Sequence, residues 1–239
     1  MLVRQPITYT NGRVTFRGQL VFDDAQPAAR PGVLVFPEAF GLNAHALQRA
    51  ERLAQLGYVA LAADPHGEAQ VLDDTTQLRP AIQACYTDRG QWRSRARAAF
   101  DALCAQPQLD RARIAAIGFC FGGTTALELA RSGADLRAVV TFHAGLLPQL
   151  LDDSGRMHAK LLICHGAEDP LVTREAIDTV VAEFRREQLD WQFIHYGGAG
   201  HSFSDPDADA RGMPGMRYDA KTERRSWQAM RHFLDEAFA

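Results

Sequence analysis

The chain has 239 residues, of which 46% are hydrophobic and 23% charged, and its formal net charge is −3 at pH 7. These values are typical of a soluble globular protein, and the length suits a single α/β domain over residues 1–239. Because no block of basic residues occurs and none is interleaved with aromatic residues, nucleic acid and membranes are not expected as partners.

The cysteines and the N-terminus point to a reducing compartment. None of the cysteines, at positions 85, 104, 120 and 164, forms a C-x-x-C pair or a zinc-ligand spacing, and the histidines lack metal-binding spacing too. The first residues lack the apolar segment of a signal peptide, and no window is long and apolar enough to span a membrane. We therefore expect a cytoplasmic protein with free thiols and no metal site.

Apolar runs of strand length alternate with segments of helical periodicity along most of the chain. The predicted strands cover residues 14–22, 33–36, 58–63, 114–117, 136–142, 161–164 and 191–196. The predicted helices cover residues 46–56, 92–106, 124–130, 173–187 and 221–238. This alternation predicts an α/β fold, with a mainly parallel twisted sheet and helices on both faces. Residues 64–92 show weak periodicity, and we interpret them as a loop with one short helix, a possible lid-like segment.

The most informative motif is Gly118-Phe119-Cys120-Phe121-Gly122-Gly123, between a predicted strand and a predicted helix. A sharp strand-to-helix turn with small flanking residues lifts one side chain above the sheet, as in a nucleophile elbow. The helix N-terminus favours the thiolate form of Cys120. The alternative is that Cys120 is a small buried hydrophobic residue and that the glycines only allow close packing.

Two further residues follow predicted strands, Asp169 after residues 161–164 and His201 after residues 191–196. Because the carboxyl ends of parallel strands share one edge of a sheet, we expect Cys120, Asp169 and His201 to meet there. Imidazole can take the proton of the thiol, and the carboxylate orients the imidazole and stabilises its cation. Individually, Asp169 could be a turn former and His201 a solvated loop residue.

An oxyanion formed during such chemistry needs backbone N–H donors. The first is expected from Phe121, directly after the proposed nucleophile, and the second from the loop after an early strand. That loop begins at Pro37, and the N–H of Ala39 is the candidate within it.

These motifs together resemble the dienelactone hydrolase family. The resemblance is carried by the elbow, by residues 165–170 (HGAEDP), by residues 196–203 (YGGAGHSF) and by residues 37–43 (PEAFGLN). It implies an α/β-hydrolase fold, a catalytic triad of Cys120, Asp169 and His201, and no cofactor. It also implies a role for Glu38, since in the family this position holds a carboxylate that contacts the resting cysteine and moves when substrate binds.

One departure from the family pattern concerns the substrate. Family members that act on dienelactones carry an arginine four residues after the catalytic histidine, where this chain has Asp205. An acidic rim would repel an anionic substrate, which favours a small neutral ester or lactone, although Arg79 or Arg211 could substitute for the missing cation. Phe40, Phe203, Trp92 and His143 are candidate pocket residues, with ordinary packing as the alternative for each.

The main hypothesis is therefore a hydrolase that forms a thioester at Cys120. The same residues could attack other electrophiles, such as phosphotriesters. A redox or thiol-sensing protein and a noncatalytic binding module on a hydrolase scaffold are the alternatives of another class. The sequence does not indicate the oligomeric state.

Overall fold

The computed structural model describes residues 1–25 and 28–239, which form two compact units, Met1–Ile117 and Gly118–Ala239. None of the helices within these residues is long and apolar enough to cross a membrane.

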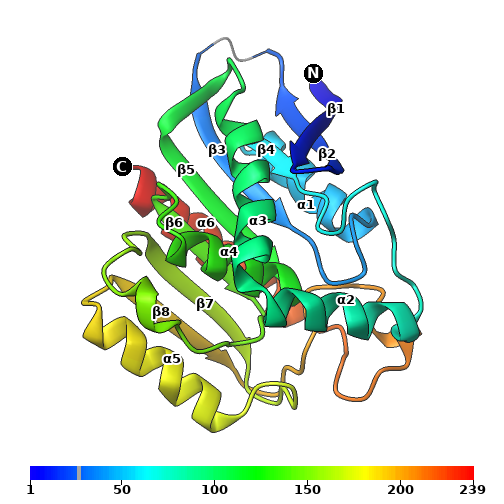
Figure 1. The fold of residues 1–239 in the computed structure, drawn as a ribbon, viewed down its shortest axis with the longest axis vertical. Coiled ribbons are helices and arrows are strands. Elements are labelled where there is room, and N and C mark those ends of the chain that lie inside the picture. The colour runs from blue at the N-terminus through cyan, green and yellow to red at the C-terminus, as the bar shows by residue number, and fades with distance from the viewer. Residues whose placement is uncertain (26–27) are drawn as a thin grey trace. The chain divides into compact units, whose positions relative to one another are not determined.

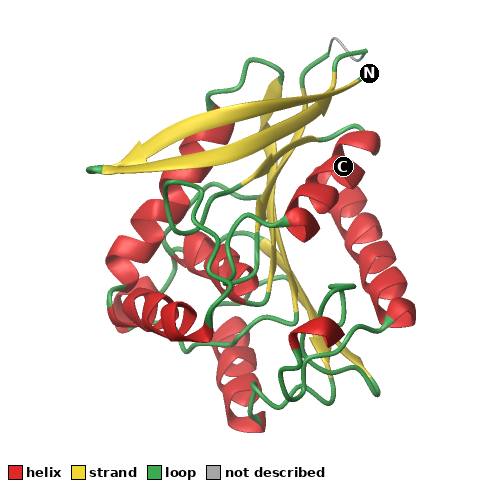
Figure 2. Ribbon diagram, turned by 90° about the vertical axis from the view of Figure 1, so that its right-hand side faces the viewer, coloured by secondary structure: helices red, strands yellow, loops and turns green. Residues whose placement is uncertain are grey.

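The first unit contains a sheet with the strand order β1-β2-β4-β3-β5. Its strands are β1 (Leu2–Asn11), β2 (Val14–Asp23), β3 (Arg30–Phe36), β4 (Val59–Ala62) and β5 (Leu109–Phe119), the last of which runs on into the second unit. Its helices are α1 (Ala44–Gln55), α2 (Thr75–Thr87) and α3 (Arg89–Cys104). Strands β1 and β2 form a long antiparallel hairpin, visible as the paired strands that start at the N-terminus in Figure 2. Strand β2 pairs antiparallel with β4, whereas β3 and β4 are parallel.

The second unit contains parallel strands in the order β6-β7-β8 (Figure 1). Its elements are α4 (Phe121–Arg131), β6 (Ala138–Phe142), β7 (Lys160–Gly166), α5 (Arg174–Arg186), β8 (Trp191–Tyr196) and α6 (Ala220–Phe238). The register aligns Phe142 with Cys164 and Gly166 with Tyr196, so the carboxyl ends of the three strands lie at the same edge. The loops that follow these strands therefore emerge together.

A buried cluster of charges joins two helices of this unit. The Arg131 guanidinium contacts Glu128 at 2.8 Å and Glu183 at 2.6 Å, and all three side chains are almost completely buried. Burial alone lowers the pKa of Arg131, but the two carboxylates outweigh it and raise that pKa. Such a cluster holds α4 and α5 together only while all its members are present.

The predicted class, an α/β fold with a mainly parallel sheet, is confirmed, and every predicted strand and helix is present. Thr173 caps α5, since its side chain accepts a hydrogen bond from the N–H of Ala176. The helix expected within residues 64–92 is α2, which contains Pro80 in its first half. Strand β1 was not predicted, because most of its side chains are exposed or half-buried and show no clear alternation of apolar residues. That residues 64–92 act as a lid stays a prediction.

Candidate functional site

Cys120 lies at the strand-to-helix turn, where β5 ends and α4 begins. Its backbone has φ 53° and ψ −118°, a conformation that residues with a side chain rarely adopt. The N–H of Cys120 donates to the carbonyl of Phe142 at the end of β6, 3.0 Å away, which ties the turn to the neighbouring strand. The side chain is partly exposed and stands at the N-terminus of α4. A strained, partly exposed thiol at a helix N-terminus is well placed to react.

Two glycines of the motif are needed for this turn. A Cβ atom on Gly118 would lie 2.1 Å from the carbonyl oxygen of Gly122, because the chain crosses itself closely there. A Cβ atom on Gly123 would lie 2.6 Å from the Cβ of Ala144. Phe121 is the first residue of α4, so its N–H belongs to the helix turn whose donors lack intrahelical partners.

His201 and Asp169 are joined by a short hydrogen bond in the same unit. Nδ1 of His201 lies 2.8 Å from Oδ2 of Asp169, and both side chains are almost fully buried. The other carboxylate oxygen of Asp169 accepts the N–H of Leu171 at 2.9 Å, which fixes the carboxylate orientation. Since a carboxylate accepts, the proton lies on Nδ1, and Nε2 is left to face another group.

Besides Asp169, Cys120 also raises the pKa of His201. Burial lowers the pKa of His201, but the charge of Cys120 and the hydrogen bond with Asp169 outweigh burial and raise that pKa to about 10. Nε2 of His201 makes no hydrogen bond of ordinary geometry within the described residues. The contact with Cys120 is therefore looser than the contact with Asp169, as is common in enzymes without bound substrate. At neutral pH this arrangement keeps the imidazole of His201 protonated.

His143 and Phe203 form the packing behind His201. The ring of His143 contacts the ring of His201 at 5.3 Å between centroids, with 62° between the ring planes, and the ring of Phe203 at 4.9 Å, nearly perpendicular. Ser204, which the sequence analysis did not single out, lies 2.8 Å from Nε2 of His143. Both side chains are fully buried, with His143 packed on the ring of His201 and Phe203 packed on His143, and a place of either in the substrate pocket stays a prediction.

The expected acidic rim is wrong at Asp205, which is fully buried. Its carboxylate forms an ion pair with Arg211 and accepts the N–H of Asp207. The physical reason is that a 3-10 turn at residues 209–211 brings the Arg211 guanidinium back onto a carboxylate six residues earlier. The negative charge of Asp205 is thus neutralised inside the protein. Arg211 is engaged in the same ion pair and is not available as the substitute cation.

The remaining candidates lie in the first unit. Oε1 of Glu38 lies 2.6 Å from Nδ1 of His45, whose Nε2 accepts a hydrogen bond from Arg49 at 2.9 Å, and these side chains are buried. The carbonyl of Ala39 accepts a hydrogen bond from Nε2 of His66 at 2.7 Å. The sequence analysis did not assign His45 or His66 to this turn, although His45 is only seven residues from Glu38.

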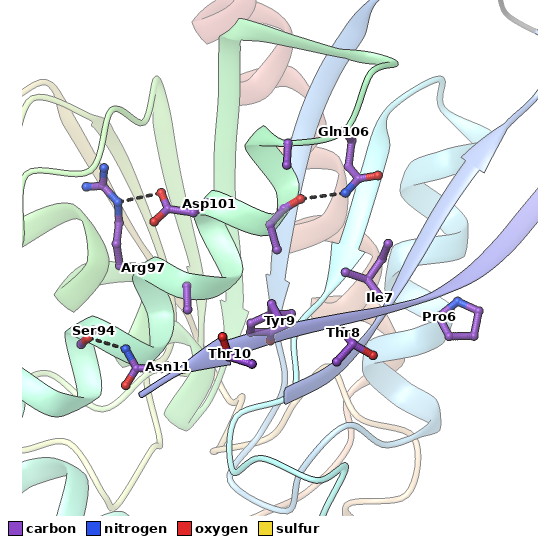
Figure 3. Close-up of a pocket in the computed structure, with 13 residues that line it drawn as sticks. Pro6, Ile7, Thr8, Tyr9, Thr10, Asn11, Ser94, Arg97, Asp101 and Gln106 are labelled. Carbon is purple, nitrogen blue, oxygen red and sulfur yellow. Dashed lines mark hydrogen bonds and ion pairs between the residues drawn. The ribbon is translucent and has the colours of Figure 1, made fainter. Parts of the chain in front are cut away.

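The aromatic candidates of the first unit differ in exposure. Phe40 is half-buried, whereas Trp92 is buried and packs against Tyr86. A cavity of about 550 Å³ in this unit lies between β1 and α3 (Figure 3). It contains none of the predicted site residues, and its Arg97 is already paired with Asp101. We assign no function to this cavity.

The thiol of Cys164 is unsuited to exchange with Cys120. It is fully buried in β7, and burial raises its pKa to about 12. All four cysteines are free. A redox role with Cys164 as the resolving thiol is therefore unsupported.

A thiol at a strand-to-helix elbow, followed by a carboxylate and an imidazole after later parallel strands, is the order found in α/β-hydrolases. The profile described as the dienelactone hydrolase family matches residues 16–238. The chain therefore belongs to the dienelactone hydrolase family and is a hydrolase of this family.

Individual relatives agree with this assignment. A putative carboxymethylenebutenolidase of Yersinia pestis is 27% identical over 227 residues, covering 87% of this chain and 78% of the relative. The solved structure named m3DLH is 60% identical with a TM-score of 0.98, covering 100% of this chain and 99% of that chain. A dienelactone hydrolase-like promiscuous phosphotriesterase, P91, from metagenomic libraries is 53% identical, with the same TM-score and the same coverage.

Proposed function

We propose that the protein hydrolyses small neutral esters or lactones by covalent catalysis at Cys120, without a cofactor. The observation that carries the proposal is the position of His201, which is hydrogen-bonded to Asp169 and electrostatically coupled to Cys120. The relatives named carboxymethylenebutenolidase support a lactone or ester as substrate, since a butenolide is a lactone.

In the proposed acylation step, the Cys120 thiolate attacks the carbonyl carbon and the carbonyl π electrons move to oxygen. The N–H of Phe121, at the start of α4, and the N–H of Ala39 hold the oxyanion. When the intermediate collapses, the bond to the alcohol oxygen breaks and the alkoxide takes the proton from Nε2 of His201. This leaves a thioester at Cys120 and a neutral imidazole.

In the deacylation step, water attacks the thioester carbonyl while His201 takes a proton from that water. The carbon–sulfur bond breaks with its electrons on sulfur, which releases the acid and restores the thiolate beside the imidazolium.

The charge on Cys120 also controls when His201 gives up its proton. Attack on the ester removes the negative charge that raises the pKa of His201. Burial then lowers that pKa with only Asp169 opposing it, so during acylation His201 passes its proton to the alkoxide.

The proposed role of Glu38 comes from the family resemblance. Its carboxylate would contact the resting Cys120 and move away when substrate binds. In this structure the Glu38 carboxylate instead lies 2.6 Å from Nδ1 of the buried His45, so it has a polar partner there.

A preference for neutral substrates no longer depends on repulsion by Asp205, because that carboxylate is buried and paired. It depends instead on the missing cation that would bind a substrate carboxylate. The position at which the family binds the substrate carboxylate holds an acid, and Arg211 is already in an ion pair with it. Arg79 is an exposed residue of α2 and stays the remaining alternative.

The proposal is tested by burst kinetics with an aryl ester. Rapid mixing should release about one equivalent of phenol per active site before the steady state, and acid quenching should leave the acyl group on the peptide that contains Cys120. The variant Cys120→Ala should lose both the burst and the turnover. Cys104→Ala changes another partly exposed cysteine and should behave as wild type. Full turnover by Cys120→Ala would sink the mechanism.

Phosphotriesters are a second candidate substrate class, favoured by the 53% identity to a protein described as a promiscuous phosphotriesterase. The thiolate would attack phosphorus and expel an aryloxide, and water would then have to displace the thiolate from phosphorus. Because that second step is demanding, a dialkyl aryl phosphate should give a burst followed by a slower steady state than a carboxylic ester gives. A steady state without any burst would argue against Cys120 as the nucleophile for phosphotriesters.

A further inference from the structure

Residues 212–217, which we call the brace, run beside the loops that carry Asp169 and His201. We infer that the brace is a positioning element, which fixes the positions of these two side chains relative to each other. This function depends on Gly215. The inference rests on the proposed function, since it concerns the orientation of the proposed acid and base. No atom of Gly215 takes part in the chemistry.

The backbone of the brace pairs with the backbone of His201 on both sides. The N–H of His201 donates to the carbonyl of Gly215, and the N–H of Arg217 donates to the carbonyl of His201, both at 3.0 Å. The pairing forms a parallel bridge between His201 and Met216. The next donor along, the N–H of Asp219, bonds the carbonyl of Phe203 at 3.0 Å. The peptide groups around His201 are thereby fixed by hydrogen bonds that are independent of its side chain.

The same glycine touches the residue after Asp169. A Cβ atom on Gly215 would lie 2.2 Å from Cγ of Pro170 and 2.8 Å from its Cδ. The φ angle of Gly215 is +77°, in the left-handed region that favours glycine. A Cβ atom on Gly200, the residue before His201, would lie 2.7 Å from the carbonyl oxygen of Gly215. Gly215 therefore contacts the neighbours of both the acid and the base.

The loop that carries Asp169 and the loop that carries His201 also contact each other directly. The N–H of Glu168 donates to the carbonyl of Ala199 at 2.9 Å, and a Cβ atom on Gly166 would lie 2.4 Å from the carbonyl oxygen of Gly200. The guanidinium of Arg217 donates to the carbonyl of Gly198, which adds a side-chain contact from the brace. A shift of the brace would therefore disturb both loops, because each contacts the brace as well as the other loop.

The test compares two glycines of the brace. Gly215→Ala and Gly212→Ala make the same change, and both sites have positive φ, +77° and +60°. Around Gly212, however, nothing lies within 4 Å of an added Cβ, so Gly212→Ala reports the backbone strain alone. We expect Gly215→Ala to lower kcat for an aryl ester on the order of 10- to 100-fold with KM unchanged, since a misplacement near 1 Å has such an effect. Gly212→Ala should stay within about twofold of wild type.

A relief variant shows whether the contact with Pro170 is the cause. Pro170→Ala removes Cγ and Cδ, and the nearest remaining atom, Cβ, would lie 3.6 Å from the added Cβ, an ordinary contact. The double variant Gly215→Ala/Pro170→Ala should therefore recover kcat to within about threefold of Pro170→Ala alone.

A pH profile separates positioning from a general loss of structure. The profile is that of the His201 ring in an NMR titration, and because Cys120 and Asp169 raise the pKa of this ring to about 10, Gly215→Ala should shift the profile toward lower pH. Gly212→Ala should leave the profile in place. Arg217→Ala, which removes an exposed side chain, should lower kcat severalfold without changing Tm, and it serves if Gly215→Ala does not fold.

The inference is overturned if Gly215→Ala and Gly212→Ala have equal kcat, if the double variant shows no recovery, or, where Gly215→Ala does not fold, if Arg217→Ala keeps the wild-type kcat. Failure of the proposed function gives a different result, namely turnover by Cys120→Ala in the same assay. The two failures are thus read from different variants.

Discussion

Replacing Cys120 by serine should turn His201 from an imidazolium into a neutral imidazole near pH 8. In the wild-type protein, burial lowers the pKa of His201, but the charge of Cys120 and the bond to Asp169 raise it from 6.5 to about 10. The proton is therefore held as the pH rises from neutrality and is lost only around pH 10. This difference corresponds to about 5 kcal/mol in favour of the charged ring.

The serine variant removes the largest of the causes that raise this pKa. A serine hydroxyl carries no charge at these pH values, whereas the burial of His201 is unchanged. We expect the pKa of His201 to fall from about 10 to about 7 or lower. Asp169→Asn should lower it as well, because the amide that replaces the carboxylate carries no negative charge.

The measurement is an NMR titration of protein labelled in the histidine rings, from acid to alkaline pH. The signal of His201 is assigned by its absence in His201→Gln. His165 is an internal control, because burial lowers its pKa and it should be neutral already at pH 8. A wild-type His201 that is neutral at pH 8, or a pKa that Cys120→Ser leaves unchanged, would refute the reasoning about charge coupling.

Three further changes test other parts of the structure. Gly118→Ala places a Cβ 2.1 Å from the carbonyl oxygen of Gly122 and should lower the free energy of unfolding in urea by about 3 kcal/mol. Its control is Gly197→Ala, which has open space around the added Cβ and should change that free energy by less than about 0.5 kcal/mol. Glu183→Gln breaks the buried contact with Arg131 and should cost about 3 kcal/mol, with kcat per folded molecule unchanged. Asp205→Asn should lower stability by about 2 kcal/mol but leave the ratio of kcat/KM for neutral and anionic esters within about threefold, because the carboxylate is buried and paired. A marked gain on anionic esters would instead restore the idea of a repelling rim.

Much of the fold could be predicted because several strands, β3, β4, β6 and β7, are buried along almost their whole length. Residues 33–36 of β3 and all of β4 are buried and form continuous apolar runs, and the loops after them are marked by glycine and proline. The same periodicity placed Cys120, Asp169 and His201 after three strands. Strand β1 was not predicted, since it is held by backbone pairing with β2 and its exposed side chains need not be apolar.

The support around the site could not be predicted from residue types. The brace acts through backbone N–H and carbonyl groups, which every sequence of that length offers, and only Gly215 marks the close approach. Ser204 and His143 meet across 61 residues of chain, and their pairing has no local signal. Asp205 looked like a surface charge because its partner Arg211 becomes a neighbour only through the turn between them.

Backbone strain in the second unit is concentrated beside the proposed catalytic residues. Among its described residues, positive φ angles at non-glycine positions occur at Cys120, His143, Gln188 and Ser202. The first is the proposed nucleophile, the second packs on His201, and Ser202 follows His201 directly. Each such residue costs on the order of 1–3 kcal/mol and persists only where the surroundings enforce it. The hydrogen bonds from Cys120 to Phe142, from His143 to Cys164 and from His201 to Gly215 supply that enforcement. Strain at Cys120, His143 and Ser202 is therefore what the proposed site would require, because these residues are the proposed nucleophile and two neighbours of the proposed base.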